Sequence, residues 1–259
     1  MTLIIGSSRP GAALMLGDAL LSYDARLASN TELPSQFLKG TQIGEKGIAG
    51  LAQKLIFLSP KLVVGWAGGM SKAQAAIRRL AVLLDGDISF ASLQRVLERD
   101  VELQTLASEV ELIFLGIAGE RQHEGLPAQV GGINAQRSGT GLFTAGSGAY
   151  HFLNLVSERS LTVDAPNENQ GAGRVLADEL AALGGRFAST VLREAFDETP
   201  LNFGYGGAFE VVIADDNGRL AKLPYTLVYW LRDQDRLVLR GPVIKVSYLA
   251  NGNMVVDRF

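Results

Sequence analysis

Cysteine is absent from the 259-residue sequence, and histidine occurs only at positions 123 and 151. A chain without cysteine cannot form disulfides, Cys-ligated zinc or iron–sulfur centres, or a thiol nucleophile. His123 lies in a polar, glycine-rich stretch without a partner at metal-ligand spacing. His151 follows Tyr150 in a helical pattern, which favours a hydrogen-bonded buried or interface residue rather than a catalytic base. The sequence therefore predicts no metal site and no cofactor.

An excess of one charge and long apolar runs are also missing. The 24 basic and 27 acidic residues give a net charge of −3, so no basic field favours nucleic acid. No run approaches the ~18 apolar residues of a membrane span, and no basic segment typical of a signal peptide precedes the first apolar residues. We expect a cytoplasmic protein that binds neither nucleic acid nor membranes.

Glycine and apolar residues, by contrast, are plentiful. Glycine fills 30 positions and hydrophobic residues make up 47%, enough for a large core with many tight turns. We expect one domain over residues 1–259 with an insertion near 27–53. Strand and helix patterns come in blocks rather than in alternation, which predicts antiparallel sheets between helices. The expected strands are 2–6, 12–16, 54–58, 61–69, 110–118, 142–145, 209–214, 225–230, 236–239, 243–249 and 254–256, and the expected helices are 71–84, 90–107, one from 149, and 174–196.

Thr2 is the first candidate for chemistry. Methionine before a small residue is the kind of initiator that cells remove, and its removal would leave Thr2 at the N-terminus. An N-terminal threonine carries nucleophile and base together, because its α-amino group, with an ordinary pKa of about 7.7–8.0, can take the proton of its own hydroxyl.

Two further candidate residues, Asp18 and Lys54, are marked by their spacing in the sequence. Asp18 follows Thr2 by sixteen positions at the end of the second expected strand. Lys54 leads a short strand fourteen residues before Gly68, the first glycine after Ala67 on the way into a helix.

Two further segments complete the pattern. Gly146-Ser147-Gly148 stands ahead of an expected helix, and Tyr205-Gly206-Gly207 leads into the strand 209–214 and an Asn-Gly turn. In this order, the motifs resemble the proteasome β-subunits and their bacterial ring-protease relatives, which are N-terminal nucleophile hydrolases. The resemblance implies an α+β fold, a four-layer αββα sandwich in which two antiparallel sheets lie between helix layers.

The resemblance implies a threonine endopeptidase and a role for each of five residues. Thr2 Oγ1 would attack the scissile carbonyl, and Lys54, paired with Asp18, would lower the pKa of the Thr2 hydroxyl and amine. Ser147 would hydrogen-bond the amine, and the backbone N–H of Gly68 would stabilise the oxyanion. Water would then hydrolyse an acyl-enzyme ester.

The same alignment implies a substrate pocket beside the scissile bond, lined by Leu21, Ala52, Ile56, Trp66 and Met70. Trp66 is large enough to make the pocket shallow, which favours small or medium apolar side chains. The partners implied are further copies of the chain in a ring or helical homo-oligomer, a peptide or unfolded-protein substrate and an ATP-dependent regulator.

The sequence also departs from the family pattern. Where the family has an aspartate and, three residues later, a serine that help to orient the nucleophile's amine, this chain has Asn202 and Tyr205, and Leu3 replaces a second threonine. These departures leave open a catalytically inactive, structural or binding subunit. An N-terminal nucleophile amidase for a small amide is a third alternative, which the lack of a large substrate-binding insert disfavours.

Overall fold

The computed structural model describes the residues that position the predicted site. They are residues 2–9, 12–24, 46–84, 90–117, 128–138, 141–158, 184–185, 201, 203–214, 218–228, 230–233, 236–239 and 243–259. Within them the chain forms seventeen strands and four helices, and every strand pair is antiparallel.

A six-stranded sheet carries the N-terminal hairpin at its centre. Its order is β12 (Leu220–Lys222), β11 (Phe209–Ala214), β2 (Ala12–Asp18), β1 (Ile4–Arg9), β10 (Leu142–Ala145) and β9 (Gln136–Ser138). The first two strands pair with each other, with Ile5 opposite Leu16. Successive residues of a strand point to opposite faces, and Ile4 and Ile5 are both buried, so this sheet is covered on both faces.

A four-stranded sheet packs on one face of the six-stranded sheet. Its order is β5 (Leu55–Ser59), β6 (Leu62–Gly68), β7 (Val110–Ile117) and β8 (Ala128–Ile133). Met15 and Val212 of the first sheet meet Val63, Ile113 and Leu115 of the second in one apolar cluster. The two sheets therefore share a dry core, and side chains that enter it from one sheet can reach the backbone of the other.

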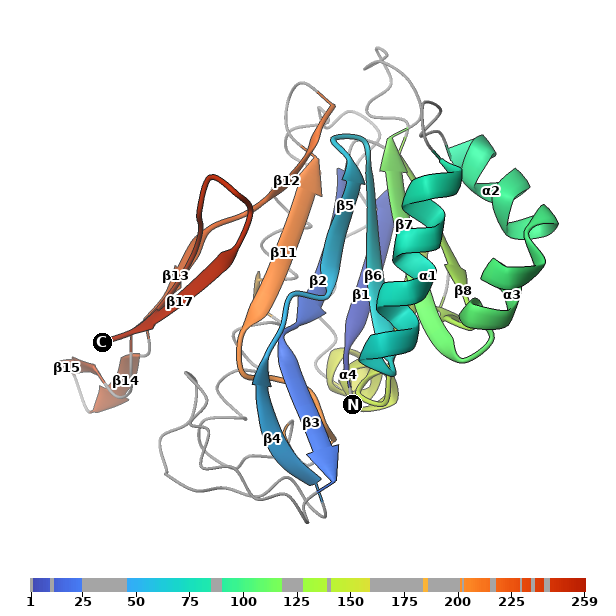
Figure 1. The fold of residues 1–259 in the computed structure, drawn as a ribbon. Helices are drawn as coiled ribbons and strands as arrows, with labels where there is room; N and C mark the ends of the chain where they lie inside the picture. Colours follow the sequence, from blue (N-terminus) through green and yellow to red (C-terminus); the bar gives the residue numbers. More distant parts are fainter. Residues whose placement is uncertain are drawn as a thin grey trace.

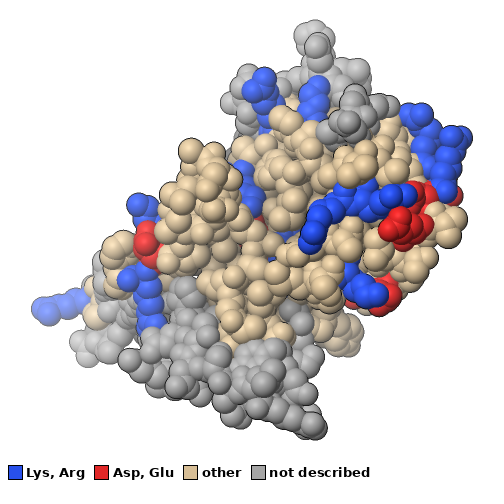
Figure 2. All heavy atoms as spheres, viewed as in Figure 1, with Lys and Arg blue, Asp and Glu red and all other residues tan. Residues whose placement is uncertain are grey.

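Three helices cover the outer face of the four-stranded sheet: α1 (Met70–Leu83), α2 (Phe90–Arg99) and α3 (Val101–Ala107) (Figure 1). Trp66 and Phe114 pack there against Ile77, Leu80 and Leu93. In Figure 2 the basic side chains form several separate groups, and acidic side chains lie beside those over the helix layer.

The predicted helix 90–107 is wrong in one respect, because the chain leaves the helical conformation at Asp100. This residue is the N-cap of α3, with φ −92° and ψ 105°, and its side chain accepts the Leu103 N–H at 2.7 Å. The apolar pattern continues across this position, so the side-chain cap rather than the hydrophobic periodicity decides the break.

The prediction of a four-layer αββα sandwich is also wrong. Among the described residues, a single helix, α4 (Ala149–Glu158), covers the outer face of the six-stranded sheet together with a separate three-stranded sheet. That sheet has the order β13 (Tyr225–Leu227), β16 (Ile244–Tyr248) and β17 (Met254–Arg258), and lies on the far side from α1 to α3 (Figure 1).

The C-terminal sequence explains this strand-rich layer. Buried Ile244 and Val246 alternate with an exposed lysine, and Asn251-Gly252 forms the turn between β16 and β17. Alternation with a turn of this kind specifies a hairpin rather than a helix. Of the predicted helix 174–196, only residues 184–185 are described, and they are helical; the rest lies outside the described residues.

Two small strand pairs complete the described structure. β3 (Leu20–Asp24) pairs with β4 (Lys46–Leu51) and extends from the end of β2 beyond the main sheets (Figure 1). Part of the expected insertion 27–53 is therefore a strand. β14 (Trp230–Asp233) pairs with β15 (Arg236–Leu239). In the described part of the chain, no helix combines the length and apolar character needed to cross a membrane.

The Asp100 cap yields a test of the helix layer. Its carboxylate also contacts the Arg79 guanidinium at 2.7 Å, and this hydrogen bond, followed by the one from Leu103 N–H, holds the pKa of Asp100 below its ordinary value of 3.8. Thermal unfolding at pH 7 should show a melting temperature a few degrees lower for Asp100→Ala, and a smaller drop for Asp100→Asn, which keeps an acceptor for Leu103.

The pH dependence of that difference has a defined sign. Because the folded-state pKa lies below the unfolded one, the carboxylate contributes stability in full above the unfolded value and loses it as pH falls through the folded value. The difference in melting temperature between wild type and Asp100→Ala should become smaller below about pH 4. An equal difference in melting temperature at pH 3 and pH 7 would show that the Asp100 charge does not stabilise the fold.

Candidate active site

Thr2 lies immediately before β1 and is 2% exposed. Its backbone N–H donates to Ser147 Oγ at 3.4 Å, and its carbonyl accepts the Gly148 N–H at 3.1 Å. The segment 146–148, which leads into α4, therefore holds Thr2 by two contacts. Ser147 is at the position that the sequence predicts for it, beside the Thr2 nitrogen.

Lys54 reaches Thr2 from the start of β5. Its side chain is fully buried, and its Nζ donates to Thr2 Oγ1 at 2.9 Å, to Asp18 Oδ1 at 2.9 Å and to the Leu20 carbonyl at 2.6 Å. An ammonium group has three N–H donors, and here each has an oxygen acceptor. The Trp66 ring adds a contact, with its centroid 6.0 Å from Nζ.

Asp18, at the end of β2, completes the buried ion pair. Besides Lys54, its carboxylate accepts the backbone N–H groups of Leu3 at 2.8 Å, Leu20 at 3.2 Å and Gly206 at 3.2 Å. A buried charge is tolerated when it is paired and hydrogen-bonded in this way. Asp18 thus ties together the start of β1, the start of β3 and the Gly206-Gly207 turn around the Lys54 ammonium.

Burial and charge pairing act in opposite directions on the two groups. Burial raises the pKa of the Asp18 carboxyl, while the Lys54 charge and the Leu3 and Gly206 N–H groups oppose that rise. Burial lowers the pKa of the Lys54 ammonium, while the charges of Asp18 and Glu210 oppose that fall. A lysine whose pKa is lowered and whose Nζ touches a hydroxyl can stabilise, or exchange a proton with, that hydroxyl.

Gly146 allows the loop to approach Thr2. Its φ is +92°, and a Cβ atom there would lie 2.1 Å from the Thr2 carbonyl oxygen, so no other residue fits. Its N–H donates to the Glu111 carboxylate at 2.7 Å. This carboxylate from β7 fixes the loop that carries Ser147.

Tyr205 places a buried ring at the position where the resemblance implies a serine. The ring packs against Gly148, where a Cβ would lie 2.2 Å from it, and its hydroxyl contacts His151 Nδ1 at 2.8 Å. The His151 ring in turn stacks on Phe203 at 4.0 Å. Tyr205 therefore supports the loop by packing, next to Gly206 that binds Asp18. Asn202 lies outside the described residues.

The remaining predicted residues are only partly arranged as a site. Gly68 ends β6 with φ +104° and is exposed, as a backbone group open to substrate requires. Met70 is 42% exposed at the start of α1, and Leu21, Ala52 and Ile56 are half-buried. Trp66 is only 2% exposed, and it packs in the core beneath α1.

Two carboxylates at the site have no place in the sequence prediction. Glu210 is fully buried and accepts the backbone N–H of Lys54, and Glu111 binds Gly146 as described. Each is the one acidic residue within an apolar strand, β11 or β7. Because carboxylates are rarely buried without a partner, that pattern is the signal by which both could be found.

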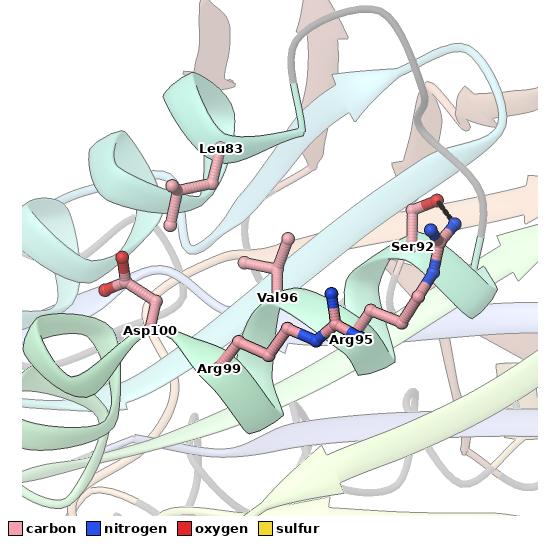
Figure 3. Close-up of a pocket in the computed structure, with 6 residues that line it drawn as sticks. All are labelled: Leu83, Ser92, Arg95, Val96, Arg99 and Asp100. Carbon is pink, nitrogen blue, oxygen red and sulfur yellow. Dashed lines mark hydrogen bonds between the residues drawn. The ribbon is translucent and has the colours of Figure 1, made fainter.

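A cavity of about 370 Å³ lies elsewhere, between the end of α1 and α2 (Figure 3). It is lined by Leu83, Ser92, Arg95, Val96, Arg99 and Asp100. None of these residues belongs to the cluster around Thr2, and Arg95 is already bonded to Ser92 Oγ at 2.7 Å. Chemistry therefore points to the Thr2 cluster and not to this cavity. Among the described residues, no group of His, Asp and Glu is arranged to hold a metal ion.

The sequence matches no protein-family model and no curated protein. The assignment of the site therefore rests on its geometry.

The ion pair can be tested by unfolding in urea. Lys54→Met leaves Asp18 as a buried charge without its counter-ion, and Asp18→Asn does the same to Lys54, so each should lose roughly 3–5 kcal/mol of stability. The double variant should lose clearly less than the sum, because the second change removes the charge that the first left unpaired. Additive losses would show that the two groups are not energetically coupled.

Proposed function

We propose that this chain is an N-terminal nucleophile hydrolase, a threonine peptidase whose nucleophile is Thr2 once the peptide bond before it has been cleaved. One observation carries the proposal: Lys54 Nζ, beside the buried Thr2 and Asp18, lies 2.9 Å from both Thr2 Oγ1 and Asp18 Oδ1. The resemblance of the surrounding motifs to the proteasome β-subunits supports it.

Cleavage before Thr2 would supply the base. It converts the Thr2 nitrogen from an amide into an amine, and Ser147 Oγ is already 3.4 Å from that nitrogen. An α-amino group with a pKa near 7.7–8.0 takes the hydroxyl proton, directly or through water. The Lys54 charge stabilises the oxyanion that develops on Thr2 Oγ1.

The reaction then follows acyl transfer. Thr2 Oγ1 forms a bond to the carbonyl carbon of the substrate, the Gly68 N–H stabilises the oxyanion, and the C–N bond breaks as the Thr2 amine passes its proton to the leaving amine. Water attacks the resulting ester and gives one proton to the Thr2 amine. The bond between the acyl carbon and Thr2 Oγ1 then breaks, the amine returns that proton to Oγ1, and the carboxylic acid leaves. No cofactor takes part in these steps.

The proposed substrate is a peptide or unfolded protein in the cytoplasm. The resemblance implies that Leu21, Ala52, Ile56 and Met70 line the substrate pocket. All four are apolar and at least partly exposed, which suits small or medium apolar side chains of a substrate. The peptidase would work in a ring or helical homo-oligomer, with an ATP-dependent regulator to deliver substrate.

An inactive, structural subunit is the second candidate, and the burial of Tyr205 favours it. The tyrosine fills with an aromatic ring the position at which the family has a hydroxyl that helps to orient the amine. A subunit of this kind would keep the Lys54–Asp18 pair for stability alone and would not react at Thr2.

A threonine-directed β-lactone separates the two candidates. Incubation of the purified protein, followed by intact mass measurement, should show a chain that begins at Thr2 and carries one covalent adduct. Thr2→Ala should give no adduct, and Thr2→Ser should keep it. Ser147→Ala should slow adduct formation by about two- to tenfold, as expected for loss of one hydrogen bond. A chain that retains Met1 and forms no adduct would refute the peptidase.

A further inference from the structure

Glu210 is a fully buried carboxylate that the proposed mechanism does not use. It lies on β11 opposite Gly17 of β2, and its neighbour two residues on, Val212, faces the core between the two sheets. Because side chains alternate along a strand, Glu210 faces the same core. It therefore crosses from the six-stranded sheet towards the four-stranded one, beside the start of β5.

The contacts of Glu210 are concentrated on the backbone that carries Lys54. Its Oε2 accepts the N–H groups of both Lys54 and Leu55, the latter at 3.0 Å. Among the described strands, β5 pairs with β6 alone and forms an edge of its sheet, so its first N–H groups depend on partners outside that sheet. One carboxylate oxygen thus holds the backbone N–H of Lys54, whose side chain reaches Thr2, and that of the next residue.

A second lysine balances the Glu210 charge. Lys222, on β12, forms an ion pair with Oε1 at 2.5 Å, and Gln53 Nε2 contacts the same oxygen at 3.5 Å. The Lys222 ammonium also lies 5.2 Å from the centre of the Tyr248 ring. Burial is the larger cause and the Glu210 charge the smaller cause of a raised pKa at Tyr248, and both keep this hydroxyl neutral. The site therefore contains a fully buried ion pair, Lys54–Asp18, and a partly buried one, Lys222–Glu210, joined through the backbone of Lys54.

We propose that Glu210 is a positioning residue for Lys54, an inference that rests on the proposed function of Lys54 beside Thr2. By fixing the Lys54 and Leu55 N–H groups, Glu210 sets the point from which the side chain reaches Thr2 Oγ1, Asp18 Oδ1 and the Leu20 carbonyl. A shift of the backbone there would break this three-fold contact, since all three distances are already at hydrogen-bond length.

Glu210 also acts on the charge of Lys54. The charged or titratable groups around the lysine are Asp18 on β2 and Glu210 on β11, with Lys222 and Tyr248 behind Glu210, and cleavage before Thr2 would add its amine. The Glu210 charge favours the ammonium form of Lys54. Without it, Lys222 would stand uncompensated in the same region, and both changes would favour neutral Lys54.

Four variants separate position from charge. Glu210→Gln keeps an oxygen for the two N–H groups but removes the charge, whereas Glu210→Ala removes both. Glu210→Gln combined with Lys222→Met removes the two charges together. Glu102→Gln is the matched control, because it removes a carboxylate that pairs with Arg79 at 3.3 Å on the exposed helix layer.

The first measurement needs no activity: the titration of Lys54 followed by ¹⁵N NMR of its Nζ, assigned with Lys54→Met. The Lys54 midpoint should move to lower pH in Glu210→Gln and return towards the wild-type value in the double variant with Lys222→Met. It should not move in Glu102→Gln. A merely structural role of Glu210 would lower the melting temperature and leave the Lys54 midpoint in place.

The second measurement is the rate of adduct formation at Thr2 with the β-lactone. We expect it to fall about tenfold in Glu210→Gln and further in Glu210→Ala, with the high-pH limb of the rate profile shifted to lower pH in Glu210→Gln. Equal Lys54 midpoints and, where the wild type reacts, equal rates in wild type and Glu210→Gln would overturn the proposal. If the wild type retains Met1 and forms no adduct, the peptidase is refuted, and the Lys54 titration alone decides the role of Glu210.

Discussion

A lysine ammonium buried away from water needs a counter-ion and an acceptor for each of its N–H donors, and Lys54 is such a group. Burial alone would favour its neutral form. Its three acceptors come from residue 2 at the N-terminus, from Asp18 at the end of β2 and from the Leu20 backbone at the start of β3. The charge of one side chain thus fixes where three segments meet. The Lys54 ammonium finds all three acceptors only when both sheets are packed together.

The two sheets contribute different parts of this arrangement. The six-stranded sheet supplies Asp18 and Glu210, and the four-stranded sheet brings in Lys54 on an edge strand whose start Glu210 holds. The loop 146–148 closes the arrangement from the α4 side, because only glycine at 146 permits its contact with Thr2. The hydroxyl of Thr2 is therefore held against a cation by groups from distant parts of the sequence, which is the kind of preorganisation that nucleophilic catalysis requires.

The sequence predicts much of this and misses the rest for physical reasons. Apolar runs and their spacing locate β1, β2, β5 and β6, although the predicted 2–6 overlaps β1 only over residues 4–6, and Thr2, Asp18, Lys54 and Ser147 do meet. The break at Asp100 depends on one side-chain cap within a continuous apolar pattern, and the layer outside the six-stranded sheet depends on where β16 and β17 pack. Local hydrophobic periodicity predicts neither the helix break nor the packing of these two strands. Glu210 contacts a strand 156 positions away, so its partner could not be known before the fold.

We propose that Lys54 and its contacts activate the Thr2 hydroxyl as a nucleophile. A crystal structure of the protein after reaction with the β-lactone tests it most directly. We expect continuous density from Thr2 Oγ1 to the acyl carbon, a free amine beside Ser147 Oγ, and Lys54 Nζ still within hydrogen-bond distance of both Thr2 and Asp18. An acyl group on any other side chain, or unmodified Thr2 still linked to a preceding residue, would contradict it.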